Sequence, residues 1–144
     1  MGLFDGMSIS GSGLTANRTW LDVIANNIAN ANTTRTPQGG PYRAQEVVFS
    51  PAANGSSFTS ALNHATGTVG QGVQVSAIVG SPAPFKLVYD PSSPNAVNGY
   101  VQMPNVNIST QMVDMISASR AYEANVTAFN AAKTMDVQSI SLGK

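Results

Sequence analysis

The sequence predicts an α+β fold in which long N- and C-terminal helices pair as an antiparallel coiled coil, with a small β-rich middle domain. Three observations predict it: a heptad pattern near the N-terminus, a C-terminal stretch without Pro or Gly, and a middle where turn signals separate short apolar runs. We expect the N-terminal helix of the coiled-coil domain over residues 1–32, a loop and small β domain over 33–107, and the C-terminal helix over 108–144.

The N-terminal helix is predicted from apolar residues at intervals of seven, with further apolar residues three positions later in the last two heptads. They are Met7, Leu14, Leu21 and Ile28, with Ile24 and Ala31. The stripe is narrow, and Asn17 occupies one of its inner positions. Gly11 and Gly13 each disfavour the helix by about 1 kcal/mol relative to Ala. A helix of this composition needs a partner helix to be stable.

The C-terminal helix is predicted over residues 109–142, where apolar residues recur with alternating steps of three and four. Its stripe consists of Met112, Met115, Ser119, Tyr122, Val126, Phe129, Lys133 and Ile140. Polar residues inside such stripes lower stability but specify register. Periodicity leaves two interpretations open: the two helices pair within one chain, or the stripes also pack between molecules.

The middle is predicted to hold one small sheet of three or four strands. Short runs suited to strands lie at 44–50, 72–80, 85–90 and 100–104, and the second of them alternates between apolar and polar residues. Turn-rich segments at 33–43 and 90–95 separate these runs, and residues 51–70 have the composition of a loop. A sheet of this size is too small to bury a large core by itself.

The composition excludes several classes of function. The 144 residues carry 7 basic and 7 acidic side chains, so no basic excess exists to neutralise nucleic-acid phosphates. The chain has no Cys and one His, which excludes disulfides, thiolate sites and multi-histidine metal sites within it. That residue, His64, lies in the predicted loop, far in sequence from any carboxylate. With no catalytic motif present, we expect no enzyme, cofactor, metal or small-molecule substrate.

Charge and targeting signals bear on location and association. Charged residues make up 10% of the chain, against about 25% in typical domains, and weak repulsion between copies favours association. No Lys or Arg precedes Arg18, and the start has no apolar core of signal-peptide length. No apolar run approaches the roughly 18 residues needed to span a bilayer. We expect neither a cleaved signal peptide nor a transmembrane helix.

An Asn-rich run in the N-terminal helix is specific enough to indicate a family. It covers residues 21–33 and reads LDVIANNIANANT. This run resembles the N-terminal signature of the bacterial flagellar axial proteins, which comprise rod, hook and hook-associated proteins. Segments 34–43, 89–91, 99–107 and 112–126 are similar to the proximal rod proteins among them. Ser93 stands where the family usually has His, and Gln111 where it usually has Glu; neither lies on a predicted stripe, so we expect only local effects.

The resemblance implies a structural subunit of the flagellar rod, which crosses the periplasm and cell wall and transmits torque from motor to hook. It implies export through the flagellar type III apparatus without a cleaved signal peptide. The terminal helices are then expected to form a coiled-coil domain lining the axial tube, and the middle an outer β domain. The implied partners are further copies of the chain, other rod proteins and the adaptor at the inner-membrane ring.

We therefore expect subunit contacts through the two stripes and the Asn-rich run. The expected contact residues are Met7, Leu14, Leu21, Ile24, Asn26, Asn27, Ile28, Asn30, Met112, Met115, Tyr122, Val126, Phe129 and Ile140. The alternative hypothesis is a secreted, non-catalytic binding module that uses the β middle for binding and the helices as a stalk.

Overall fold

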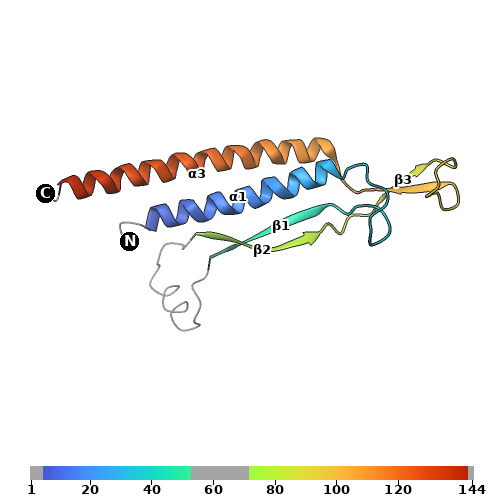
Figure 1. Ribbon diagram of the computed structural model, residues 1–144, viewed down its shortest axis with the longest axis horizontal. Helices are drawn as coiled ribbons and strands as arrows, with labels where there is room; N and C mark the ends of the chain where they lie inside the picture. The colour runs from blue at the N-terminus through green and yellow to red at the C-terminus, as the bar shows by residue number, and fades with distance from the viewer. Residues whose placement is uncertain (1–4, 53–71, 143–144) are drawn as a thin grey trace, which may run out of the picture.

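Two long helices lie antiparallel along the molecule, and a β-hairpin lies beside one of them (Figure 1). The computed structural model describes residues 5–52 and 72–142; His64 and nearly all of the predicted loop at 51–70 lie outside them. Helix α1 spans Asp5–Ala29 and helix α3 spans Ile108–Leu142. The predicted α+β class, with long terminal helices packed together, is confirmed.

The side chain of Asn107 caps the start of α3. The Oδ1 atom of Asn107 accepts hydrogen bonds from the backbone N–H groups of Ser109 and Thr110, at 3.0 and 3.3 Å. The first N–H groups of a helix have no partner within it, so this cap stabilises the point at which α3 begins. At the other junction, α1 ends in a turn in which the Ala31 N–H bonds to the Ile28 carbonyl at 3.2 Å.

The first hairpin packs on α1. Strand β1 (Gln45–Pro51) pairs antiparallel with β2 (Val73–Gly80), with a bulge between Val48 and Phe49. The Phe49 ring meets the Trp20 ring edge to face at 5.9 Å between centroids. Near the start of β2, the Ser12 Oγ accepts a hydrogen bond from the Val73 N–H at 3.1 Å. Helix α1 is therefore enclosed by α3 on one side and by this hairpin on another (Figure 1).

The second hairpin is separate, so the prediction of a single small sheet is wrong. Strands β3 (Lys86–Tyr89) and β4 (Tyr100–Met103) form a two-stranded sheet of their own, at the end of the molecule opposite the C-terminal end of α3 (Figure 1). The segment joining β2 to β3 contains Pro82 and Pro84. Proline has no N–H to give to a strand ladder, so the chain cannot continue the first sheet here.

A two-residue turn leads into β4. Val97 and Tyr100 exchange backbone hydrogen bonds of 2.9 and 3.0 Å across Asn98 and Gly99. Both central residues have positive φ, 53° and 79°, as a type I′ turn requires. Asn and Gly adopt this conformation at the least cost, which explains the Asn-Gly pair at this position.

Side chains at the junction tie the two hairpins together. Asn105, which precedes α3, accepts a hydrogen bond from the Ala44 N–H at 2.8 Å and donates one to the Ala83 carbonyl at 3.0 Å. Arg43 donates to the Ser81 carbonyl at 2.7 Å, and its guanidinium lies 4.5 Å from the centre of the Phe85 ring. The second hairpin is thus fixed to the base of the first by polar and cation–π contacts.

The core is thin. Most of its buried apolar residues are alanines, and the largest is an isoleucine: Ala16, Val23, Ile24, Ala31, Ala44, Val101 and Ala118. Many larger apolar side chains of the strands and of α3 are exposed. Among the described residues, no helix combines the length and apolar character that a membrane span requires.

Candidate subunit interface

The register between α1 and α3 follows steps of seven residues. A methyl group built on Gly6 would lie 3.7 Å from the Ala132 Cβ, and one built on Gly13 would lie 3.0 Å from the Asn125 Oδ1. Further along, Asn27 donates a hydrogen bond to Gln111. Each heptad forward in α1 therefore matches a heptad backward in α3. We call these positions the seam: Gly6, Gly13, Trp20 and Asn27 on α1, and Gln111, Ala118, Asn125 and Ala132 on α3.

The seam lies one residue before the predicted stripe on both helices. Small residues and amides occupy most of the contact, and Ala118 has no exposed surface at all. The predicted residue Leu14 instead follows Gly13, and Val126 follows Asn125. Because small side chains let the helix axes approach closely, the larger apolar residues lie beside the line of closest contact.

Both predicted stripes lie on the same side of the helix pair. A step of one residue turns a helix position by about 100°. The two helices are right-handed and run in opposite directions, so this step rotates both stripes toward one flank. Ser12, one residue before Gly13, is turned to the other side, where it contacts β2. We define the apolar flank as Met7, Leu14, Leu21 and Ile28 of α1 with Met112, Met115, Tyr122, Val126 and Phe129 of α3.

The expected contact residues differ in their exposure. Ile24 and Asn27 are 2% and 1% exposed and lie inside the packing of the chain itself. Most of the others are half-buried: Met7, Leu14, Leu21, Ile28, Asn30, Met115, Tyr122, Val126 and Phe129. Asn26, Met112 and Ile140 are exposed. The chain therefore leaves most of the expected residues partly accessible to a neighbour, whereas Ile24 and Asn27 are enclosed by the chain itself.

The C-terminal part of α3 extends beyond the described part of α1 (Figure 1). By the heptad register, Lys133 is level with Asp5, the first described residue of α1. The apolar residues that follow on α3 are exposed: Met135, Val137, Ile140 and Leu142. A free monomer seldom leaves so many large apolar side chains in contact with water within one short segment.

The sequence did not predict the buried hydrogen-bond network around Asn27. The Asn27 Nδ2 donates to the Gln45 carbonyl at 2.8 Å and to the Gln111 Oε1 at 2.9 Å. Its Oδ1 accepts from the Gln45 N–H at 2.8 Å and from the Tyr42 hydroxyl at 3.0 Å. Burial raises the pKa of Tyr42 above its usual value of 10.0, so this hydroxyl keeps its proton to higher pH than an exposed tyrosine does.

Gln111 takes part in the contact between the two helices. We expected only local effects at this position, and the structure places Gln111 on the seam, where it accepts a hydrogen bond from Asn27 of the opposite helix. The difference follows from the offset of one residue between the predicted stripe and the seam. A Glu at this position, as the resemblance would lead one to expect, could also accept the Asn27 hydrogen bond through a carboxylate oxygen.

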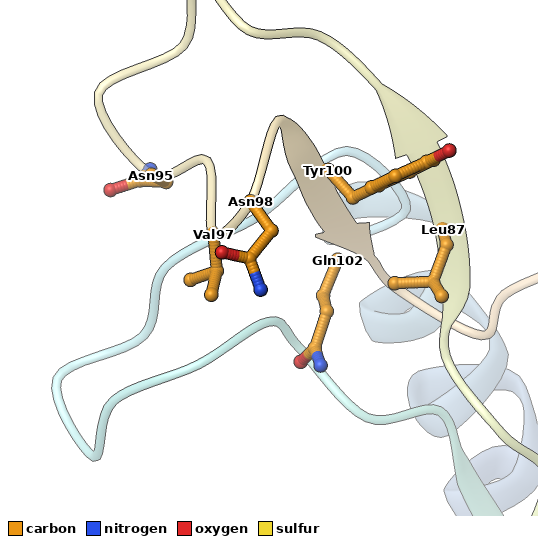
Figure 2. A pocket seen from close by; sticks show the side chains of 6 residues that line it. All are labelled: Leu87, Asn95, Val97, Asn98, Tyr100 and Gln102. Carbon is orange, nitrogen blue, oxygen red and sulfur yellow. The ribbon is translucent and has the colours of Figure 1, made fainter.

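The second hairpin carries a shallow hollow of about 370 Å³ (Figure 2). It is lined by Leu87, Asn95, Val97, Asn98, Tyr100 and Gln102. Figure 2 shows Leu87 on β3 and Gln102 on β4, with Asn95 and Asn98 on the connection between these strands. The lining has no carboxylate, amine or imidazole, so it offers no acid–base pair. Nor does any group of three or more His, Cys, Asp or Glu in the described ranges form a metal site.

Two family models match the chain, one at each terminal helix. A model described as flagella basal body rod protein matches residues 7–35. A model described as flagellar basal body rod FlgEFG protein C-terminal matches residues 97–142. The matched segments contain most of α1 and all of α3, which are the helices that form the seam and the apolar flank.

Several relatives match along nearly their whole length, and three of them are flagellar basal-body rod proteins FlgC. The chain is 48% identical over 142 residues to the flagellar basal-body rod protein FlgC of Borreliella burgdorferi, covering 94% of this chain and 93% of the relative. It is 45% identical over 152 aligned positions to FlgC of Bacillus subtilis, and 43% identical over 145 to FlgC of Escherichia coli. Both of these matches cover all of each chain.

Proposed function

The chain belongs to the FlgC family of flagellar basal-body rod proteins, and from that premise we propose that the apolar flank is the surface through which it assembles. It is a structural subunit of the basal-body rod, and the alternative of a secreted binding module with a helical stalk is set aside. The proposal concerns the residues that make the subunit contacts and the partners that they meet.

The observation that carries the proposal is the half-burial of the predicted stripes. Apolar residues of α1 and α3 meet on one flank, where they cover one another in part and keep accessible surface. The first hairpin covers the other side of α1, through Ser12 and Phe49. The chain thus leaves the apolar flank without a cover among its described residues. Burying such a surface against a neighbour is favourable by about 25 cal/mol per Å².

The outer face of α3 extends this surface. Met112, Val113 and Ile116 are 53%, 62% and 56% exposed, close to the start of the helix. The exposed apolar residues Met135, Val137, Ile140 and Leu142 lie near the C-terminal end of the same helix. A subunit packed on several sides would bury both sets, which supports contacts to more than one neighbour.

The proposed partners are further copies of this chain and other rod proteins, with the adaptor at the inner-membrane ring as a further candidate. Export through the flagellar type III apparatus, without a cleaved signal peptide, is part of the same proposal. The chain has no Cys, so it would not form mispaired disulfides outside the cytoplasm.

Charge substitutions on the flank test the proposal. Leu21→Asp and Ile28→Asp place a carboxylate where an apolar contact is expected, and either should abolish rod incorporation and swimming in a strain that lacks the native chain. Thr15→Asp is the matched control, because Thr15 is exposed on α1 away from the flank. Far-UV circular dichroism of each purified variant shows whether the helix pair persists. Normal swimming and rod incorporation of both flank variants would disprove the proposed interface.

A further inference from the structure

One buried amide holds together three parts of the chain that are far apart in sequence. Asn27 lies near the end of α1, Gln45 is the first residue of β1, and Gln111 lies in the first turns of α3. From α1, the Asn27 side chain forms hydrogen bonds in two directions. Gln45 and Tyr42 bind it on the side of the strand, and Gln111 binds it from α3. The Asn27 side chain itself is 1% exposed.

The hydrogen-bonding capacity of this side chain is fully used. A side-chain amide has two N–H donors and an oxygen with two lone pairs. Both Nδ2 donors and both Oδ1 lone pairs of Asn27 have partners within 3.0 Å. No other side chain of this length offers two donors and two acceptors. Asp lacks the donors, Leu lacks both, and Gln is longer by one methylene.

The pairing with Gln45 resembles that of a neighbouring strand. Both the N–H and the carbonyl of Gln45 bond to the one Asn27 amide, at 2.8 Å each. The opposite edge of β1 pairs with β2, where Gln45 stands across from Gly80. Asn27 therefore supplies a short piece of ladder at the place where β1 begins, and it fixes the direction in which the hairpin leaves the helices.

The network is complete only when the helices are paired in register. The Gln111 Oε1 accepts the second Nδ2 hydrogen from across the seam. Without α3 in place, that hydrogen has no partner among the described residues. The same amide therefore binds α3 and the first residue of β1.

We propose that Asn27 is a positioning residue that couples the pairing of α1 and α3 to the docking of the β1–β2 hairpin, with Tyr42 and Gln111 as its partners. Its value for a rod subunit, which rests on the function proposed above, is that the apolar flank and the hairpin are presented to neighbours in one fixed relative orientation. The coupling itself is a property of the single chain and is tested on it.

The chain offers separate probes for the two elements. Its one tryptophan, Trp20, lies on the seam and touches Phe49 of β1, so a change in its fluorescence without a change in the helical signal reports hairpin undocking. Far-UV circular dichroism reports the helices. Hydrogen exchange of the Gln45 amide, measured by NMR on the full-length chain, reports the network directly.

Asn27→Leu is the decisive variant, because Leu has the branched shape of Asn, with bulkier methyl groups, and removes all four bonds. We expect Gln45 amide exchange to accelerate more than tenfold and the Trp20 emission to shift to longer wavelength, while the helical signal is retained. Asn26→Leu, an exposed neighbour of the same type, is the matched control and should leave Gln45 exchange unchanged. Gln45 exchange within threefold of the native chain in Asn27→Leu would overturn the proposal.

Loss of helix and hairpin in equal proportion in Asn27→Leu would also overturn it, because Asn27 would then be an ordinary core residue.

Milder variants keep the test open to refutation should Asn27→Leu fail to fold. In Gln111→Glu, which retains an acceptor, the Gln45 amide should exchange at the native rate. In Gln111→Leu the Gln45 amide should exchange several-fold faster. Equal exchange in these two would contradict the role of α3. Because these readouts need no rod, their failure leaves the flank proposal untouched, and failure of the flank variants leaves these results valid.

Discussion

Two glycines of α1 provide a matched test of the seam. Gly11 and Gly13 are two residues apart in one helix, so replacing either with Ala should bring the same gain in helix propensity, about 1 kcal/mol. Their surroundings differ. No atom beyond the helix backbone lies within 4 Å of a Cβ built on Gly11, whereas a Cβ on Gly13 would meet the Asn125 amide at 3.0–3.1 Å. Gly11→Ala should therefore raise the free energy of unfolding by the full amount.

At Gly13 the gain is opposed. The Asn125 amide would have to move by a few tenths of an ångström, and it is held by a 2.9 Å hydrogen bond to the Ala121 carbonyl. Loss of that bond costs about 1 kcal/mol, so Gly13→Ala should leave stability unchanged or slightly lower. Combining Gly13→Ala with Asn125→Ala removes the obstruction. Relative to Asn125→Ala alone, the added methyl should then stabilise by about 1 kcal/mol.

Urea unfolding followed by circular dichroism measures these differences. With a slope of about 1–3 kcal/mol per molar urea, a change of 1 kcal/mol moves the midpoint by about 0.3–1 M. Equal stabilisation by Gly11→Ala and Gly13→Ala in the native background would show that Asn125 does not press on Gly13. The close contact between Gly13 and Asn125 in the seam would then be refuted.

Two further predictions concern the strand side of the molecule. Burial raises the pKa of Tyr42, so the folded chain retains this proton more strongly than the unfolded chain does; its contribution is complete below pH of about 10 and is lost as pH rises above that value. The urea midpoint between pH 8 and 11 should thus fall more steeply in the native chain than in Tyr42→Phe, and parallel curves would contradict this. Gly99→Ala should loosen the second hairpin by more than about 1 kcal/mol, because Gly99 has a φ of 79° and a Cβ there would lie 3.1 Å from the Tyr89 ring. Near-UV circular dichroism of the tyrosines should weaken while the far-UV helical signal stays constant; an unchanged tyrosine signal would count against the turn geometry.

The sequence allowed the elements to be predicted better than their contacts. Heptad spacing and the absence of Pro and Gly located α1 and α3, and alternation located β2. Periodicity follows the large apolar residues, however, and the closest contact between helices selects small ones. For this reason the stripes containing Leu14 and Val126 were assigned to the contact itself, and the seam is one residue earlier on each helix.

The remaining errors have a common cause. A run of apolar residues predicts a strand but does not reveal its partner, so four strands were placed in one sheet although Pro82 and Pro84 separate two hairpins. The Asn-rich run identified a family, yet single-sequence reasoning could not show which amide is buried. Asn26 and Asn27 are adjacent and identical in type, and only the arrangement of β1 and α3 distinguishes them.

The antiparallel seam has a consequence for the architecture of such subunits. Ala29 and Ile108 lie at the same end of the helix pair, so all of residues 30–107 is an insertion between two points that the helices already hold together. The entropy of closing a flexible connection grows only with the logarithm of its length, and doubling it costs about 0.6 kcal/mol. The register of the helix pair therefore does not depend on the length of the segment inserted between the two helices. Outer domains of different lengths could be exchanged on the helix pair without altering how Gly13 meets Asn125.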